Sequence, residues 1–155
     1  MKIKSKKVNR ENFKKYGNVV LAPAGEPTAQ AGDFKFWSDL GHFTINGETE
    51  IGICTVFRQF TNEVSVVERH TQTPEILIPI DGSFVLPLLL DSNTDDKLEA
   101  FTVHIGEAVV IDENVWHGPC LPLAQDALSY YVIFRRGTPH NDVEKRTISS
   151  VYVEI

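Results

Sequence analysis

The chain has few cysteines, no long apolar run and no excess of positive charge, and each shortage excludes a class of protein. Cys54 and Cys120 are the only cysteines, too few for a small secreted scaffold built on disulfides. No stretch approaches the roughly 18 apolar residues that a membrane-spanning helix needs, so we expect no membrane association. The formal net charge of -6 argues against a nucleic-acid partner, because phosphate binding requires a surplus of lysine and arginine.

What remains is the profile of an ordinary globular protein. The 155 residues are 42% hydrophobic and 23% charged, and we expect one domain over residues 1–155. The basic segment 1–8 is not followed by the apolar stretch of a signal peptide, so we read it as a solvated end and expect a cytoplasmic protein.

Short apolar segments separated by turn residues dominate the sequence. Asn9 can cap a short helix from Arg10 to Tyr16, and Gly17 just beyond it is typical of a helix end. After this helix we expect strands at 18–21, 34–37, 42–45, 50–57, 63–69, 75–80, 84–90, 101–105, 107–111, 128–134 and 151–153. Many short strands at regular spacing, broken by Gly, Pro, Asn and Asp, indicate an all-β sandwich or barrel.

Four residues with metal-binding side chains can meet in such a fold. Glu68 and His70 are two residues apart, so on a strand their side chains lie on one face. Glu75 opens the next apolar segment and can return beside them on a paired strand, and His117 follows much later in a turn-rich stretch. Two imidazoles and two carboxylates form a plausible shell for a divalent metal ion such as zinc, nickel, manganese or iron.

The spacing of these residues resembles the two motifs of the cupin superfamily. Glu68-x-His70-x4-Glu75-x6-Gly82 resembles the first motif, with Glu68 in place of a histidine. Gly106-x5-Asp112-x-Asn114-x2-His117 resembles the second, with Asp112 for proline and Asn114 for glycine. The resemblance implies a cupin-type double-stranded β-helix, or jelly-roll barrel, with the short helix N-terminal to it. It also implies Glu68, His70, Glu75 and His117 as metal ligands.

Along most of its length the chain is also similar to the ureidoglycolate lyase family, formerly called ureidoglycolate hydrolases, which has a cupin fold. The matching elements are Glu11-x-Phe13-x2-Tyr16-Gly17, Glu68-Arg69-His70, Ile78-Pro79 with Gly82, Asn114-Val115-Trp116-His117-x-Pro119 and Asn141-Asp142-Val143-Glu144. Such enzymes split ureidoglycolate into glyoxylate and urea during the breakdown of purines and allantoin. Two positions depart from the family pattern, which usually has glutamine at Glu75 and a second histidine at Gly118.

The chemistry of ureidoglycolate assigns roles to several of these residues. A base must take the proton of the hydroxyl group and an acid must protonate the departing urea nitrogen. Glu68 or Glu75 can be the base where it does not bind the metal, and His117 can be the acid where it is free. Arg58 is our candidate for binding the substrate carboxylate, because a guanidinium group can hold a carboxylate through two hydrogen bonds. Arg69 should point to the opposite face from its neighbours.

Two other functions remain open from the sequence. One is a metal-dependent cupin that acts on a sugar or another small polar metabolite, which Glu75 and Gly118 favour. The other is a cupin that binds a small ligand without catalysis. In each case the partner is a small molecule, and because cupins commonly pair through sheet edges we expect a homodimer.

Overall fold

Two β-sheets that face each other make up the body of the protein. The computed structural model describes all of residues 1–155. In the eight-stranded sheet the order is β1 (Lys2–Lys4), β15 (Glu144–Glu154), β7 (Glu63–Arg69), β12 (Trp116–His117), β9 (Phe84–Leu89), β10 (Glu99–Val103) and β2 (Lys6–Lys7), with β13 (Leu121–Pro122) also paired to β9. In the five-stranded sheet the order is β3 (Gly17–Val20), β11 (Ala108–Ile111), β8 (Glu75–Pro79), β14 (Ala127–Arg135) and β6 (Thr49–Phe57).

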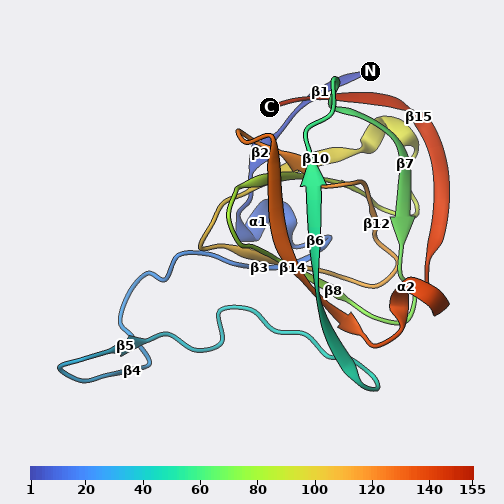
Figure 1. Ribbon diagram of the computed structural model, residues 1–155. Helices are drawn as coiled ribbons and strands as arrows, with labels where there is room; N and C mark the ends of the chain where they lie inside the picture. The colour runs from blue at the N-terminus through green and yellow to red at the C-terminus, as the bar shows by residue number, and fades with distance from the viewer.

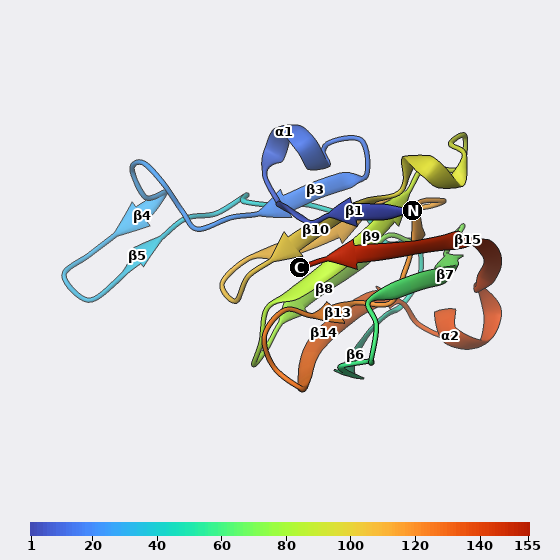
Figure 2. The same ribbon diagram turned by 90° about the horizontal axis from the view of Figure 1, so that it is seen from above.

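The remaining elements are small. They are the helices α1 (Arg10–Phe13) and α2 (Thr138–Asn141), a 3-10 turn at Asp95–Lys97, and the hairpin of β4 (Ala29–Gln30) and β5 (Lys35–Phe36). None of the helices is long and apolar enough to cross a membrane. Figure 1 shows the strands wrapped into a barrel, and Figure 2 shows α1 beside β3 at one side of it. The expected all-β jelly-roll barrel of the cupin type with a short N-terminal helix is therefore confirmed.

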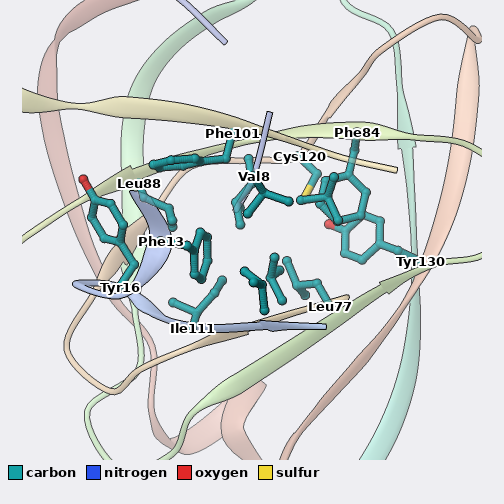
Figure 3. Close-up of a cluster of buried hydrophobic side chains, with 14 of the residues drawn as sticks. Val8, Phe13, Tyr16, Leu77, Phe84, Leu88, Phe101, Ile111, Cys120 and Tyr130 are labelled. Carbon is teal, nitrogen blue, oxygen red and sulfur yellow. The ribbon is translucent and has the colours of Figure 1, made fainter. Parts of the chain in front are cut away.

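The larger part of the core lies between the sheets, and β9 shows how the sequence builds it. Every residue of β9 is buried, and successive side chains of a strand point to opposite faces. Phe84, Leu86 and Leu88 therefore belong to the larger apolar cluster, whereas Val85 and Leu89 belong to a smaller one. Figure 3 shows part of the larger cluster, in which aromatic rings from α1 and β10 meet. This apolar packing fills one part of the barrel and leaves the region near β6 and β7 open.

The N-terminal helix begins where the sequence predicts, but it ends early. Asn9 accepts a hydrogen bond from the backbone of Asn12, and the side chain of Asn12 accepts one from the backbone of Asn9. The helix stops at Phe13, and the chain turns so that Phe13 and Tyr16 are both fully buried. Burial of these two rings in the core outweighs the local preference for another helical turn.

Two further sequence-based expectations about the fold were wrong. The basic N-terminal segment is not a free solvated end, because β1 pairs in parallel with β15 and β2 pairs in parallel with β10. The expected strand at 42–45 does not form, and this stretch has no strand pairing although Asn46-Gly47 follows it. The alternating pattern at 42–45 is too short to form a strand without a neighbouring strand to pair with.

Glu99 ties the N-terminal segment to β10 and is expected to make stability depend on acid pH. Burial alone raises the pKa of Glu99, but hydrogen bonds from Lys15, Lys6 and Tyr16 outweigh it and hold the pKa at about 2. A depressed folded-state pKa gives stability that is fully present above the unfolded value near 4.5 and is lost as the pH falls toward 2. We expect this contribution to be on the order of 1–2 kcal/mol after allowance for partial exposure.

Denaturant unfolding of the Glu99→Gln variant at several pH values measures this effect. The variant should be less stable than the wild type at pH 6, and the difference should disappear as the pH approaches 2. Glu113→Gln removes an exposed carboxylate and is the control. Its stability should match that of the wild type both at pH 6 and near pH 2. If the free energies of unfolding of Glu99→Gln and wild type differ by the same amount from pH 6 to pH 2, the charge of the carboxylate does not contribute to stability.

Candidate functional site

Strand register places the four predicted metal ligands together between the sheets. Glu68 on β7 and His117 on β12 are directly opposite each other on antiparallel strands, so their side chains share a face. His70 follows one residue after β7 ends and points to the same side as Glu68. Glu75 is the first residue of β8 and reaches the cluster from the five-stranded sheet.

Interatomic distances show how closely the four side chains approach. One ligand atom each of Glu68, His70 and His117 lies within 4.8 Å of the others. Glu75 Oε2 lies 3.0 Å from His117 Nε2 and 3.5 Å from His70 Nε2. The cluster therefore has a tight part, formed by Glu75 and the two imidazoles, and a looser part at Glu68.

The tight part contains three buried polar atoms that face one another and make no hydrogen bond to the rest of the protein. His70 Nε2, His117 Nε2 and Glu75 Oε2 are all buried without a hydrogen bond. Such atoms are rare in folded proteins, because an unpaired polar group that is removed from water is destabilising. Three such atoms that face one another at 3.0 and 3.5 Å fit a single shared cation better than three separate defects.

The other ring nitrogen of His70 fixes the orientation of the imidazole. His70 Nδ1 lies 2.7 Å from the backbone carbonyl of Asp142, which can only accept, so Nδ1 carries the proton and donates. The Asp142 carboxylate accepts hydrogen bonds from the backbone N–H groups of Thr71 and Gln72, which holds the adjoining turn. Metal-binding histidines usually have such a partner for the second nitrogen, because it aims the lone pair of the first nitrogen at the ion.

The distances fit a shared metal ion. Two atoms that are each about 2.1 Å from one ion are about 3.0–3.4 Å apart at right-angled or tetrahedral angles. The separations of 3.0 and 3.5 Å around Glu75 Oε2 are of this size. Glu75, His70 and His117 thus fit a divalent ion, and Glu68 can complete the set.

Charge within the cluster also favours a cation. Burial raises the pKa of Glu75, but the facing imidazoles of His117 and His70 outweigh it, and the pKa lies below its ordinary value. Burial lowers the pKa of His70, but the Glu75 carboxylate outweighs it and raises the pKa to about 8. Glu75 is therefore an anion that draws positive charge to this point, either as a proton on His70 or as a metal ion.

A cavity of about 760 Å³ opens above the cluster, between β6 and β7, and is large enough for a small organic acid. The four predicted ligands line it, together with Cys54, Cys120 and Gly118. Burial raises the pKa of the Cys120 thiol, which disfavours the thiolate that a nucleophile requires.

The two departures from the cupin and family patterns at Asn114 and Gly118 have local explanations. Asn114 has a φ of 67°, in the left-handed region that asparagine tolerates better than most residues, so it can replace a glycine there. A Cβ atom added at Gly118 would lie 3.1 Å from side-chain atoms of Pro87 and Val64. A histidine at this position would therefore require both neighbours to shift.

The structure does not bring Arg58 to the site. Its guanidinium group donates to the carbonyl of Gln125 at 3.1 Å and lies 3.8 Å from a carboxylate oxygen of Asp126, and Arg58 does not line the cavity. It follows the last residue of β6, where the chain turns away. The sequence could not show this, because the end of a strand and the direction of its last side chain depend on pairing with β14.

Lys145 supplies a cation to the cavity that sequence reasoning missed. It lines the cavity and is directly opposite Glu68 in the pairing of β15 with β7. A signal was present in the sequence, since Lys145 directly follows the family-like element Asn141-Asp142-Val143-Glu144. That element also contains Asp142, the partner of His70.

Arg69 lies outside the cavity and links β7 and β12, the two strands that carry Glu68 and His117. Its guanidinium group stacks over the ring of Trp116 at 4.5 Å and pairs with Asp91 at 2.8 Å and with Glu144 at 2.7 Å. The indole N–H of Trp116 donates to the same Asp91 carboxylate at 3.0 Å. Since Arg69 lies between Glu68 and His70, and Trp116 precedes His117, this outer network holds β7 and β12 in register.

Comparisons with solved structures give likenesses of limited extent. An oxalate decarboxylase from Bacillus subtilis, studied for its Mn(II) centres, is matched with a TM-score of 0.48 and 14% identity, over 65% of this chain and 24% of its own. A Lactobacillus farciminis oxalate decarboxylase, in complex with formate, has a TM-score of 0.48 and 13% identity, over 63% of this chain and 26% of its own. The chain spans about a quarter of the length of each.

Sequence comparisons cover nearly the whole chain. The family model described as ureidoglycolate lyase matches residues 1–154. A ureidoglycolate lyase from Agrobacterium fabrum (strain C58) is 24% identical over 145 residues, which are 89% of this chain and 86% of that protein. The match confirms the resemblance to this family. The chain belongs to the ureidoglycolate lyase family, and its enzyme class is that of a lyase.

Proposed function

We propose that this protein cleaves ureidoglycolate into glyoxylate and urea in purine and allantoin degradation, and that a divalent metal ion assists the reaction. The observation that carries the proposal is the group of three buried, unpartnered atoms on His70, His117 and Glu75 at the wall of the cavity. Family membership supplies the substrate class. Zinc, nickel, manganese and iron all accept such a mixture of nitrogen and oxygen ligands, and the choice among them is left to measurement.

The four predicted residues divide into a metal-binding set and a proton carrier. His70, His117 and Glu75 form the tight part of the cluster and would hold the ion. When bound, the ion would polarise the substrate hydroxyl and lower its pKa. Glu68 is only partly buried and faces the cavity, so its carboxylate can reach a substrate that the other three residues position. His117, enclosed beside Glu75, is assigned to the metal-binding set rather than the role of acid.

Glu68 would then move a single proton. Its carboxylate takes the proton of the substrate hydroxyl, the C–O bond becomes a carbonyl, and the C–N bond to the ureido group breaks. The same proton, now on Glu68, passes to the departing nitrogen and completes urea. Atoms and charge balance without water or any further reactant, which agrees with a lyase.

Lys145 is the group that we propose for the substrate carboxylate, in place of Arg58. Lys145→Met should raise KM for ureidoglycolate roughly 10- to 100-fold, because a charge-assisted hydrogen bond contributes about 1.5–3 kcal/mol. Lys145→Arg keeps the positive charge and should retain most of the affinity. Steady-state assays of both variants measure the effect, and an unchanged KM in Lys145→Met would exclude this role.

A combined metal and activity measurement tests the function. Purified protein should contain about one divalent ion per chain and should release urea from ureidoglycolate, and a chelator should remove both properties until metal is restored. His117→Gln should lose both, while His42→Gln, at an exposed histidine with no role here, should keep both. Protein that binds no metal and releases no urea would contradict the proposal, and turnover that survives complete metal removal would contradict the part played by the ion.

The setting of this activity is also part of the proposal. We propose that residues 1–155 act as one cupin domain in the cytoplasm, on a small-molecule substrate, and that two copies form a homodimer. β6 is an edge strand that pairs only with β14, and an uncovered edge strand is a common site of association between two copies.

A further inference from the structure

Residues 21–48, here called the arm, leave the barrel after β3 and return to it at β6. Figure 1 and Figure 2 both show the β4–β5 hairpin of the arm standing away from the rest of the molecule. Hydrogen bonds give the arm a definite shape, including Thr28 N–H to Phe36 O at 2.7 Å and Trp37 Nε1–H to Gly25 O at 3.2 Å. Its return path is tied to the body by hydrogen bonds, where the side chain of Asn18 bonds both backbone groups of His42.

The arm lacks a core of its own. Phe34, Phe36 and Phe43 are 50%, 53% and 46% exposed. A hairpin with strands of two residues is not stable alone in water, because it buries too little apolar surface to offset the loss of backbone freedom. A surface that covers these rings would stabilise it.

A matching apolar face lies next to the arm in sequence, on the edge strand of the five-stranded sheet. Ile51, Ile53 and Phe57 on β6 are 68%, 63% and 64% exposed. Tyr131, the partner of Ile53 on β14, is 41% exposed, and Phe60 just beyond β6 is fully exposed. We call these five side chains the β6 face.

We propose that two copies of the chain exchange arms, so that each arm packs on the β6 face of the other copy. This inference rests on the proposed homodimer but not on the proposed chemistry. The three phenylalanines of the arm and the five side chains of the β6 face expose roughly 900 Å² per copy, taking about 200 Å² for each fully exposed aromatic side chain. Both copies together would bury about 1,800 Å², within the range of about 1,200–2,000 Å² typical of stable interfaces.

Symmetry favours a second copy over an unrelated partner. The arm leads directly into β6, so one two-fold axis beside β6 would bring both arm–face contacts together and close the assembly. The exchange covers both exposed surfaces of each chain at once. A foreign protein on the β6 face would leave the rings of the arm in water.

Light scattering with size-exclusion chromatography on full-length variants tests the exchange. Wild-type protein should be a dimer, and both Phe36→Glu in the arm and Ile53→Glu on the face should raise the dissociation constant on the order of 30-fold or more. Ile105→Glu, at a 56% exposed isoleucine between β10 and β11, is the matched control and should remain a dimer. An equal mixture of the arm and face variants should regain heterodimer, since it retains one intact arm–face contact.

Two results would contradict the arm exchange, and they can be told apart. A wild-type monomer at tens of micromolar would overturn both the homodimer and the exchange. A dimer that Ile53→Glu breaks and Phe36→Glu does not would show direct pairing of β6 edges and would overturn the exchange alone. Should either variant fail to fold, hydrogen exchange of the wild type decides. The exchange is supported if hydrogen-exchange protection of residues 29–36 and of β6 rises in parallel as the protein concentration increases. It is refuted if this protection does not depend on concentration.

Discussion

Glu75→Gln is expected to weaken metal binding by more than about 100-fold, since loss of even an outer partner of a metal ligand reduces affinity 10- to 100-fold. The substitution keeps the size and shape of the side chain and removes only its charge and one acceptor oxygen. In wild-type protein, Glu75 Oε2 is the atom that faces both imidazoles. A glutamine instead places a donor near them, so the amide N–H can bond a ring nitrogen that would otherwise bind the ion.

The same substitution should not lower the thermal stability of the metal-free protein and can raise it. Above about pH 8 the His70 imidazole is neutral and its Nε2 only accepts, so an amide donor at residue 75 would satisfy a nitrogen that a carboxylate cannot. At that pH we therefore expect metal-free Glu75→Gln to unfold at the same temperature as metal-free wild type, or at a higher one, while its metal-dependent stabilisation is much reduced.

Calorimetric metal titration and thermal unfolding with and without metal measure the two effects. Glu50→Gln is the matched control, because Glu50 is a carboxylate that lines the same cavity outside the cluster. Unchanged metal affinity in Glu75→Gln would show that this carboxylate is not a ligand. Urea release that is unaffected by the substitution would show that the additional carboxylate, at a position where the family usually has an amide, is incidental to the reaction.

The sequence predicts the cluster because local periodicity and turn residues determine its parts. Glu68 and His70 fall on one face of any strand that contains both, and the following turn returns Glu75 to them. Most strands can be recognised in the sequence for the same reason, since β7, β8 and β14 are apolar segments with turn residues on both sides. The fold class then follows from the number and spacing of such segments.

Residues placed by long-range pairing could not be predicted from these patterns. Lys145 enters the cavity because β15 pairs with β7, which is more than 70 residues away in the chain. Asp142 orients His70 through a backbone carbonyl, a group that every residue type has, so the residue type at position 142 does not predict this contact. Arg58 was expected at the site from its charge and strand alone, and the turn after β6 directs it to Gln125 instead.

Glu68→Gln is expected to lower kcat for urea release by about 10²- to 10⁴-fold, the range typical of loss of a general base. Glu68 lies opposite His117 in the strand register, and its neighbour Arg69 is held by Asp91 and Glu144 on the outer face, so an isosteric amide should keep the local structure. Because glutamine cannot accept and return a proton, the loss should appear in kcat rather than in KM.

The metal content of Glu68→Gln separates the role of base from that of ligand. If Glu68 carries the proton while His70, His117 and Glu75 hold the ion, the variant should bind metal nearly as well as the wild type and still turn over slowly. Glu63→Gln, on the same strand and in the same cavity, is the control and should keep both properties. A variant that loses metal and activity in parallel would instead place Glu68 among the ligands. In that case the proton would have to be carried by another group that faces the cavity.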